Sequence, residues 1–346
     1  MKQGTRFIFP LLIVATGIVI LIVTKRVFPT NIVPRLPLGS SPSPTPFPFE
    51  EVTIDGLRKR AYTGTLGEKT IYEKRSTYTS YLTSYTSDMY KINALLTEPT
   101  GPMPQGGWPA IVFIHGYIPP KQYETTSRYV AYVDYLASQG FAVLKIDLRG
   151  HGQSEGQAGG AYYSSDYVID TLNAYAALQG YQNINPDRIG LWGHSMAGNV
   201  VMRSAAVKPT IPAVVIWAGV GYTYEDIQKY RISDASYQRP PGMPTAQGRR
   251  RNPIVEMYGE PNLTVPFWQK FAPASYLHEL QGAVQIHHAI DDDVVNIGYS
   301  RDLNALLEKT SVPHEFFEYQ SGGHNIEGYS FAQAIERTSE FYKKEL

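Results

Sequence analysis

Short, nearly continuous apolar runs alternate along the chain with longer segments in which apolar residues recur every three or four positions. The apolar runs fall at 110–114, 141–146, 189–193, 213–218, 283–289 and 316–319. The longer segments fall at 123–137, 166–178, 196–207, 299–307 and 331–343. Apolar runs separated by amphipathic helices are typical of buried parallel strands, so the pattern predicts an α/β fold with a mostly parallel sheet and helices on both faces. A pair of earlier strands is expected at 70–77 and 89–96.

The alternation breaks between Gly221 and Leu280, where Tyr, Pro, Arg and Gln are frequent. We expect an insertion at about 221–272 between two strands of the sheet. Its sharpest feature is a run of three arginines at 249–251. This run is interpreted either as a solvated loop or as a contact for an anionic substrate group or for lipid headgroups.

The N-terminus has a different pattern. Phe7–Val23 is almost wholly apolar and basic residues flank it, so we expect a membrane anchor in 1–27 with one transmembrane helix at about 7–24. The alternative is a cleaved secretory signal, but no convincing cleavage site is present. Proline and serine dominate 28–50, which predicts an extended linker. One large domain at 51–346 follows, and we expect it outside the cytoplasm.

Composition narrows the possible functions. The 346 residues contain no cysteine, and 31 basic residues balance 31 acidic ones. Disulfides and thiol chemistry are therefore excluded, and nothing electrostatic favours nucleic acid as a partner. The sequence has no phosphate-binding loop, dinucleotide fingerprint or Cys/His cluster, so we expect no cofactor and no metal. His287 and His288 precede three aspartates, but neighbouring strand residues point to opposite faces, which argues against a shared metal ion.

A candidate nucleophile lies where the apolar run at 189–193 meets a helical segment. The stretch from Gly193 to Ala197 reads Gly-His-Ser-Met-Ala, which places Ser195 at a strand-to-helix corner. Such a turn exposes a serine hydroxyl, and small flanking residues let the helix backbone approach the strand closely. Alanine replaces the usual final glycine and is small enough for that approach. The alternative interpretation is an ordinary turn. One oxyanion donor would be the backbone N–H of Met196.

A nucleophilic serine needs a base, and that base needs an acid that orients it. His324, which follows two glycines in the loop after the run at 316–319, is the candidate base. The candidate acids are Asp291, Asp292 and Asp293, directly after the run at 283–289. Only one of the three can point at His324.

Several motifs together resemble α/β-hydrolases of the prolyl-oligopeptidase type. Besides the serine turn, they are the His-His-x-x-x-Asp-x-x-Val loop, an Asp-x-Arg-Gly-His-Gly-x-Ser run, and a Pro-x-x-Tyr stretch before the acid strand. These motifs occupy 287–295, 147–154 and 273–276. In the acid loop Ala289 replaces the usual glycine and Asn296 the usual proline. Asp147 and Arg149 are interpreted as a turn-fixing ion pair rather than as a catalytic pair.

The resemblance implies an α/β-hydrolase fold and a Ser195–Asp292–His324 triad, with Asp291 as the alternative acid. It also implies the Tyr117 N–H as the second oxyanion donor. It further implies that the insertion at about 221–272 is a cap that covers the mouth of the active site and shapes its pocket. Only about forty residues separate the linker from the catalytic region, which leaves no room for the β-propeller of the peptidases. We therefore expect a membrane-anchored serine hydrolase that cleaves a small ester or amide, or a short peptide, through an acyl-enzyme. The alternatives are an aminopeptidase or dipeptidase activity and a catalytically silent anchored binding protein.

Overall fold

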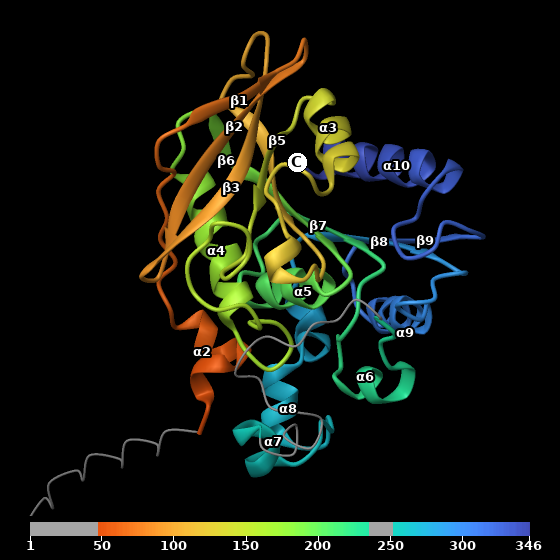
Figure 1. Ribbon diagram of the computed structural model, residues 1–346. Coiled ribbons are helices and arrows are strands. Elements are labelled where there is room, and N and C mark those ends of the chain that lie inside the picture. Colours follow the sequence, from red (N-terminus) through yellow and green to blue (C-terminus); the bar gives the residue numbers. More distant parts are fainter. Residues whose placement is uncertain (1–47, 235–251) are drawn as a thin grey trace, which may run out of the picture. The chain divides into compact units, whose positions relative to one another are not determined.

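The computed structural model describes residues 48–234 and 252–346, and within them nine strands form one sheet (Figure 1). The strand order across the sheet is β1-β2-β3-β5-β4-β6-β7-β8-β9. Pairing is antiparallel from β1 through β3 to β5 and parallel from β5 to β9. The strands are β1 Thr70–Lys74, β2 Tyr78–Ser87, β3 Tyr90–Pro99, β4 Trp108–Ile114, β5 Ala142–Ile146, β6 Ile184–His194, β7 Ala213–Trp217, β8 Ala283–Ala289 and β9 His314–Tyr319.

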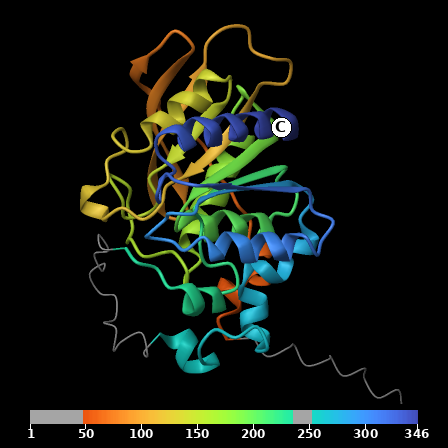
Figure 2. The same cartoon turned by 90° about the vertical axis from the view of Figure 1, so that its right-hand side faces the viewer.

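Helices cover both faces of the sheet, as Figure 2 shows for α10 and α3 on one face and α5 and α9 on the other. The first face carries α3 Val130–Ser138 and α10 Tyr329–Glu345. The second carries α2 Ile54–Arg58, α4 Asp166–Gln179, α5 Ala197–Val207 and α9 Gly298–Leu307. The described residues also contain three short 3-10 turns: η1 Glu50–Val52, η2 Pro120–Gln122 and η4 Pro273–Glu279.

The parallel strands are buried on both sides, which explains their continuous apolar sequences. Every residue of β5, β7 and β8 is buried, and so are the last six of β4. On the α3 and α10 side, Phe113 stacks on Trp192 with ring centroids 3.9 Å apart. This packing fixes β4 and β6 side by side, so the loops after both strands leave the sheet at one edge.

Two sequence expectations were wrong in detail. The predicted strand pair at 70–77 and 89–96 is a set of three strands, because the Tyr-, Ser- and Thr-rich segment between them is β2. The helix expected at 123–137 begins only at Val130. The cause is the buried Lys145, whose ammonium donates to the backbone carbonyls of Thr125 and Arg128 and holds that segment as a loop.

The region of the expected cap is helical where it is described. It contains α6 Glu225–Tyr230, α7 Pro253–Tyr258 and α8 Pro266–Phe271, and η4 follows them. The cap contacts the start of the described chain: Tyr258 Oη donates to the carbonyl of Pro48 at 2.8 Å, and Lys270 pairs with Asp55 at 3.3 Å. The arginine run at 249–251 lies outside the described residues.

The expected anchor at 7–24 and most of the linker at 28–50 also lie outside the described residues. In the part of the chain that the structure describes, no helix combines the length and the apolar character that a bilayer crossing requires. The anchor therefore stays a prediction from the sequence. Pro48–Leu346 form one compact unit, which carries all the residues proposed for chemistry.

Candidate active site

Ser195 lies at the corner between β6 and α5 with a backbone φ of 55°. This left-handed conformation costs a non-glycine residue about 1–3 kcal/mol, so the surrounding structure must enforce it. The Ser195 N–H donates to the carbonyl of Trp217 at 2.9 Å, and the Gly198 N–H donates to the carbonyl of Ser195 at 2.8 Å. A Cβ on Gly193 would lie 2.7 Å from the carbonyl oxygen of Ala197. Glycine there lets α5 cross β6 closely, and the sharp turn at Ser195 results.

The Asp292 carboxylate lies after β8 and is saturated with hydrogen bonds. Its Oδ1 accepts the N–H groups of Val294 and Val295, each at 2.9 Å. Its Oδ2 accepts His324 Nδ1–H at 2.9 Å and His288 Nε2–H at 3.1 Å. Burial by itself would raise the pKa of this carboxyl, but the hydrogen bonds from His288 and His324 outweigh burial and hold that pKa well below its usual value. Asp292 is therefore an anion at every physiological pH.

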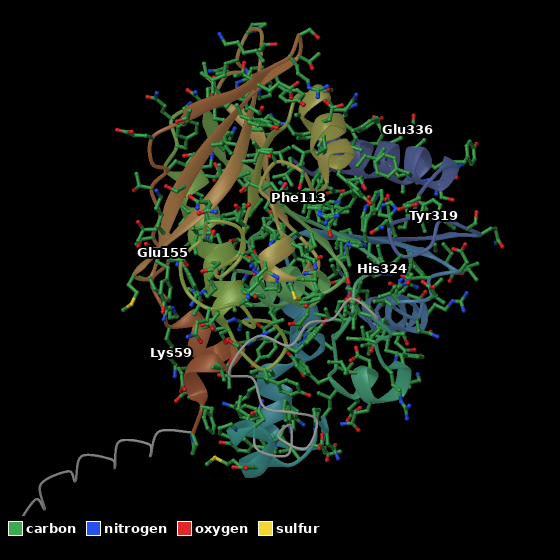
Figure 3. The ribbon with its side chains drawn as sticks, in the orientation of Figure 1. Lys59, Phe113, Glu155, Tyr319, His324 and Glu336 are labelled. Atoms are coloured by element: carbon green, nitrogen blue, oxygen red, sulfur yellow. The ribbon has the colours of Figure 1, made fainter. Side chains whose placement is uncertain are left out.

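The adjacent Asp291 has a different task. Its exposed carboxylate accepts the N–H groups of Gly323 at 2.9 Å and Gly322 at 3.2 Å, in the loop between β9 and α10. His324 follows these glycines, and Figure 3 labels it just beyond β9. The geometry thus places Asp292 against the His324 imidazole and Asp291 against the backbone of the same loop.

His324 lies next to the serine turn, although the two side chains are not hydrogen-bonded. The His194 and His324 rings have centroids 4.6 Å apart, and His194 Nε2 lies 2.9 Å from the carbonyl oxygen of His324. Ser195 directly follows His194 in the chain. Within residues 48–234 and 252–346 the Ser195 hydroxyl has no hydrogen-bond partner. Catalytic hydrogen bonds are often loose in free enzymes and tighten on substrate binding.

The two expected oxyanion donors come from neighbouring loops. Met196 immediately precedes α5, where the helix dipole and the unpaired N–H groups of the first turn favour negative charge. Tyr117 is half-buried in the loop after β4. β4 and β6 pair directly in the sheet, with Ile114 opposite Gly193. Both loops therefore leave the same end of adjacent strands.

Two histidines have roles that the sequence interpretation did not assign. His288 Nε2 donates a hydrogen bond that is shared between Asp292 Oδ2 at 3.1 Å and the carbonyl oxygen of Val295 at 2.9 Å, and its Nδ1 lies 2.7 Å from the Ser300 hydroxyl. His287 points the other way into the core and contacts Tyr319 Oη at 2.8 Å. The expected opposite orientation of this pair is observed. In the described ranges, no group of three or more His, Cys, Asp or Glu residues could hold a metal ion.

The pair proposed to fix the turn after β5 is not a pair. Arg149 instead binds the buried carboxylate of Asp170 through Nη2 at 2.7 Å. Asp147 accepts hydrogen bonds from Tyr123 and Thr125, and burial raises the pKa of its carboxyl to about 6. Because each group has its own partners, both are structural and neither is placed for catalysis.

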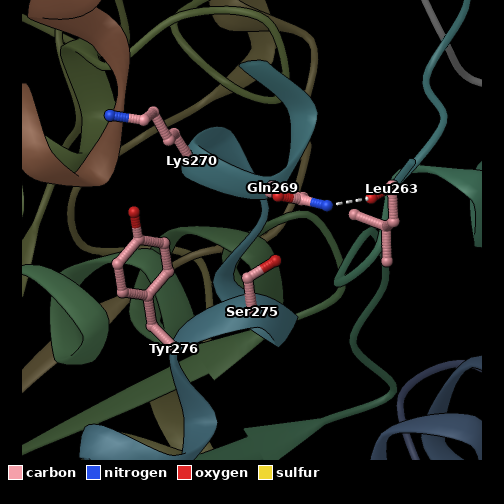
Figure 4. A pocket seen from close by; sticks show the side chains of 5 residues that line it. All are labelled: Leu263, Gln269, Lys270, Ser275 and Tyr276. Atoms are coloured by element: carbon pink, nitrogen blue, oxygen red, sulfur yellow. Dashed lines mark hydrogen bonds between the residues drawn. The ribbon is translucent and has the colours of Figure 1, made fainter. Parts of the chain in front are cut away.

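A pocket of about 490 Å³ lies in the cap region, as Figure 4 shows. Gln269 donates to the carbonyl of Leu263 at its rim, at 2.7 Å. Its lining residues come from α8, η4 and the preceding loop: Leu263, Gln269, Lys270, Ser275 and Tyr276. None of the residues expected to carry chemistry lines it, so this pocket is not the proposed active site.

Two comparisons of sequence found similar proteins. Residues 109–231 match the model of the family described as serine aminopeptidase, S33. The chain is 25% identical over 248 residues to the uncharacterized peptidase YtmA of Bacillus subtilis (strain 168), across 70% of this chain and 85% of that protein.

Solved structures show the same fold in esterases and peptidases. Acetyl xylan esterase from Paenibacillus sp. R4 superposes with a TM-score of 0.63 at 16% identity, across 85% of this chain and 92% of that one. Pyrococcus horikoshii acylaminoacyl peptidase superposes with a TM-score of 0.58 at 18% identity, across 78% of this chain and 42% of that one. Residues 48–234 and 252–346 contain no β-propeller.

The expected fold and family resemblance are thus confirmed. A doubly covered, mostly parallel sheet carries a strained serine turn, and the similar proteins include esterases and peptidases. The chain is a serine hydrolase with the α/β-hydrolase fold, and it resembles the catalytic part of prolyl-oligopeptidase-type enzymes.

Proposed function

We propose that this serine hydrolase cleaves a small ester or amide through a covalent acyl-enzyme, with Ser195 as nucleophile, His324 as base and Asp292 as the orienting acid. The observation that carries the proposal is the 2.9 Å contact between Asp292 Oδ2 and His324 Nδ1, beside the strained turn of Ser195. The contact sets the His324 tautomer: Nδ1 carries the proton, and Nε2 keeps a lone pair for the serine.

The chemistry follows from these roles. As Ser195 Oγ bonds to the substrate carbonyl carbon, its proton passes to His324 Nε2, and the carbonyl oxygen becomes an anion facing the N–H groups of Met196 and Tyr117. The carbon–oxygen or carbon–nitrogen bond then breaks, and the leaving group takes the proton from His324. Water repeats the sequence on the acyl-enzyme and releases the acid. Asp292 stays ionised throughout and stabilises the imidazolium.

Ester or small-amide substrates are favoured over peptides. The acetyl xylan esterase shares the fold over nearly its whole length, whereas the acylaminoacyl peptidase is matched over less than half of its own. The described residues also lack a propeller that would restrict access to short peptides. The second candidate is an aminopeptidase or dipeptidase activity, supported by the family match at 109–231 and by YtmA.

A substrate panel separates these functions. We would assay p-nitrophenyl esters of increasing acyl length against aminoacyl and dipeptidyl p-nitroanilides, with Ser195→Ala and His324→Ala as controls. The proposal predicts faster turnover of the short-chain esters, abolished in both variants. Preferential cleavage of the anilides would establish the peptidase. Wild-type protein that turns over none of them would favour the silent binding protein.

We further propose that residues 7–24 anchor the protein in a membrane and that the catalytic domain lies outside the cytoplasm. The support is the apolar run with basic flanks, followed by the proline-rich linker. The arginines at 249–251 would then serve as a contact for anionic headgroups or anionic substrates.

A further inference from the structure

A chain of hydrogen bonds connects three loops around the proposed active site through His194, the residue before the nucleophile. The Gly116 N–H, in the loop after β4, lies 2.9 Å from Tyr129 Oη. Tyr129 Oη lies 2.8 Å from His194 Nδ1, and His194 Nε2 lies 2.9 Å from the carbonyl oxygen of His324. One buried imidazole thus joins the oxyanion loop to the loop that carries the base.

The direction of every bond in this chain is determined. A carbonyl oxygen can only accept, so His194 Nε2 carries a proton. Burial lowers the pKa of His194 to about 3, so the ring is neutral at physiological pH and carries that one proton. Nδ1 must then accept the hydroxyl proton of Tyr129, and the Tyr129 oxygen accepts the Gly116 N–H. The four groups fit together in a single tautomer and a single rotamer.

Close packing holds the chain in place. The Tyr129 ring meets Phe113 and Trp192 edge-on, with centroids 5.4 and 5.9 Å away. A Cβ on Gly116 would lie 3.0 Å from both His194 Nδ1 and Tyr129 Oη, so a side chain there would push the two partners apart. Tyr129 itself has a φ of 58° at the start of α3. This backbone conformation is strained, so the contacts of Tyr129 must stabilise it.

The last hydrogen bond of this series holds the loop that carries His324, and the backbone position of that loop must be fixed. Gly322 and Gly323, which lead to His324, have no side chains that could pack, and their N–H groups are bound by the exposed Asp291 carboxylate. His194 fixes the His324 carbonyl, and Tyr132 Oη fixes the next one, at Asn325, at 2.8 Å. With its backbone held, the His324 imidazole has only its side-chain torsions left to set.

We propose that Tyr129 and His194 are positioning residues that hold the His324 backbone and the Gly116–Tyr117 loop in register with Ser195. This inference rests on the function proposed above. A displacement of about 1 Å in a reacting group can cost about 100-fold in rate. Loss of the Tyr129 hydroxyl leaves the Gly116 N–H and His194 Nδ1 without their partner, and the base and the oxyanion loop lose their common support.

Tyr129→Phe is the sharpest variant, because it removes one oxygen atom and touches neither Ser195 nor His324. We expect kcat for p-nitrophenyl acetate to fall about 10- to 100-fold with KM within about twofold. Tyr85→Phe is the matched control: Tyr85 Oη also donates a buried hydrogen bond, at 2.9 Å to the carbonyl of Asp170, but contacts no proposed catalytic group. It should cost similar stability and leave kcat unchanged.

His194 offers a rescue test in the same assay. His194→Leu removes both hydrogen bonds and should lower kcat at least as far as Tyr129→Phe. His194→Gln keeps an N–H donor near the position of Nε2 and should recover part of the loss. A merely structural role predicts that kcat follows stability across these variants. Positioning predicts that kcat falls when the hydrogen-bond chain is broken at either Tyr129 or His194, and that it partly recovers when His194→Gln restores the donor to the His324 carbonyl.

NMR of 15N-histidine-labelled wild-type protein tests the geometry without any activity. The chain of hydrogen bonds requires His194 to show a neutral Nε2–H tautomer that does not titrate between pH 5 and 9. An Nδ1–H tautomer, or a Tyr129→Phe protein with unchanged kcat, would overturn the positioning role alone. A wild type that neither hydrolyses the ester nor reacts with a fluorophosphonate would instead remove the proposed function, and this inference with it.

Discussion

At the scale of single residues, the site depends on how each side chain is held. Asp292 accepts four hydrogen bonds, two of them from imidazoles, so its charge and direction are fixed before substrate binds. Ser195 and His324 were identifiable from the sequence because glycines and strand ends mark their turns. The roles of His194 and His288 were not. His194 faces a residue 130 positions away, which no local pattern indicates, and the run of three aspartates after His288 does not show which of them its imidazole contacts.

Replacing the two neighbouring aspartates tests the assignment of the acid. Asp292→Asn should lower kcat by about 10⁴-fold, because the amide favours the wrong His324 tautomer. Asp291→Asn keeps an oxygen for a loop N–H and should cost less than about tenfold. Steady-state rates on an activated ester decide between the two aspartates. A larger loss of kcat for Asp291→Asn would identify Asp291 as the acid instead of Asp292.

His288 provides a second test at this scale. His288→Phe removes one donor to the Asp292 carboxylate while filling most of the space. A hydrogen bond to a charged group contributes about 1.5–3 kcal/mol, so kcat should fall about tenfold or more through a less well held carboxylate. An unchanged kcat, with folding confirmed by circular dichroism, would show that Val294, Val295 and His324 hold Asp292 sufficiently.

At the scale of elements, the alternation of apolar runs and helical segments predicted the parallel strands and the helices that cover them. β2 was not predicted as a separate strand because its tyrosines, serines and threonines give no apolar run. The start of α3 was missed because a tertiary contact from Lys145 decides where the helix begins. Local pattern therefore predicts elements whose formation depends on burial, and fails where a distant side chain binds the backbone.

Breaking the buried ion pair between Asp170 of α4 and Arg149, in the turn after β5, should lower the stability of the fold measurably. The Asp170 side chain is fully buried against Arg149, so Asp170→Ala leaves a guanidinium without its main partner. We expect a loss of about 3–5 kcal/mol in the free energy of unfolding in urea. Glu340→Ala, in the exposed pair with Lys343, is the control and should cost about 0–1 kcal/mol. Equal losses would contradict the structural role of Arg149.

A buried histidine in β8, His287, makes stability depend on pH. Burial lowers the pKa of His287 to about 3, whereas an unfolded histidine titrates near 6.5. Between these values the unfolded state binds the proton and the folded state does not, so stability falls by about 1.4 kcal/mol per pH unit as the pH drops. Urea unfolding at pH 7.5 and 5 should show a shallower decline for His287→Gln than for wild type; parallel declines would refute this.

At the scale of the whole molecule, one compact unit, Pro48–Leu346, carries every group proposed for chemistry. The start of the described chain is fixed to it by Arg203, which is fully buried and donates to the carbonyl of Val52 at 2.7 Å. The short segment that follows the linker is thus part of the domain. The expected linker would therefore connect directly to the folded domain.

The anchor prediction belongs to this scale. Full-length protein should sediment with membranes, resist alkaline carbonate and enter solution only with detergent, because about 17 apolar residues suffice to hold a helix in a bilayer. Deleting residues 7–24 should release an active hydrolase. Protein that carbonate extracts at full length, or that loses its N-terminus on maturation, would favour the cleaved secretory signal.

The most direct test of the central claim is to locate the acylation site. Wild-type protein treated with a fluorophosphonate should gain the mass of one phosphonyl group, and tandem mass spectrometry of the digest should place it on Ser195. Ser195→Ala should gain nothing, and His324→Ala should react far more slowly. An adduct on another residue, or no adduct on a folded wild type, would contradict the account.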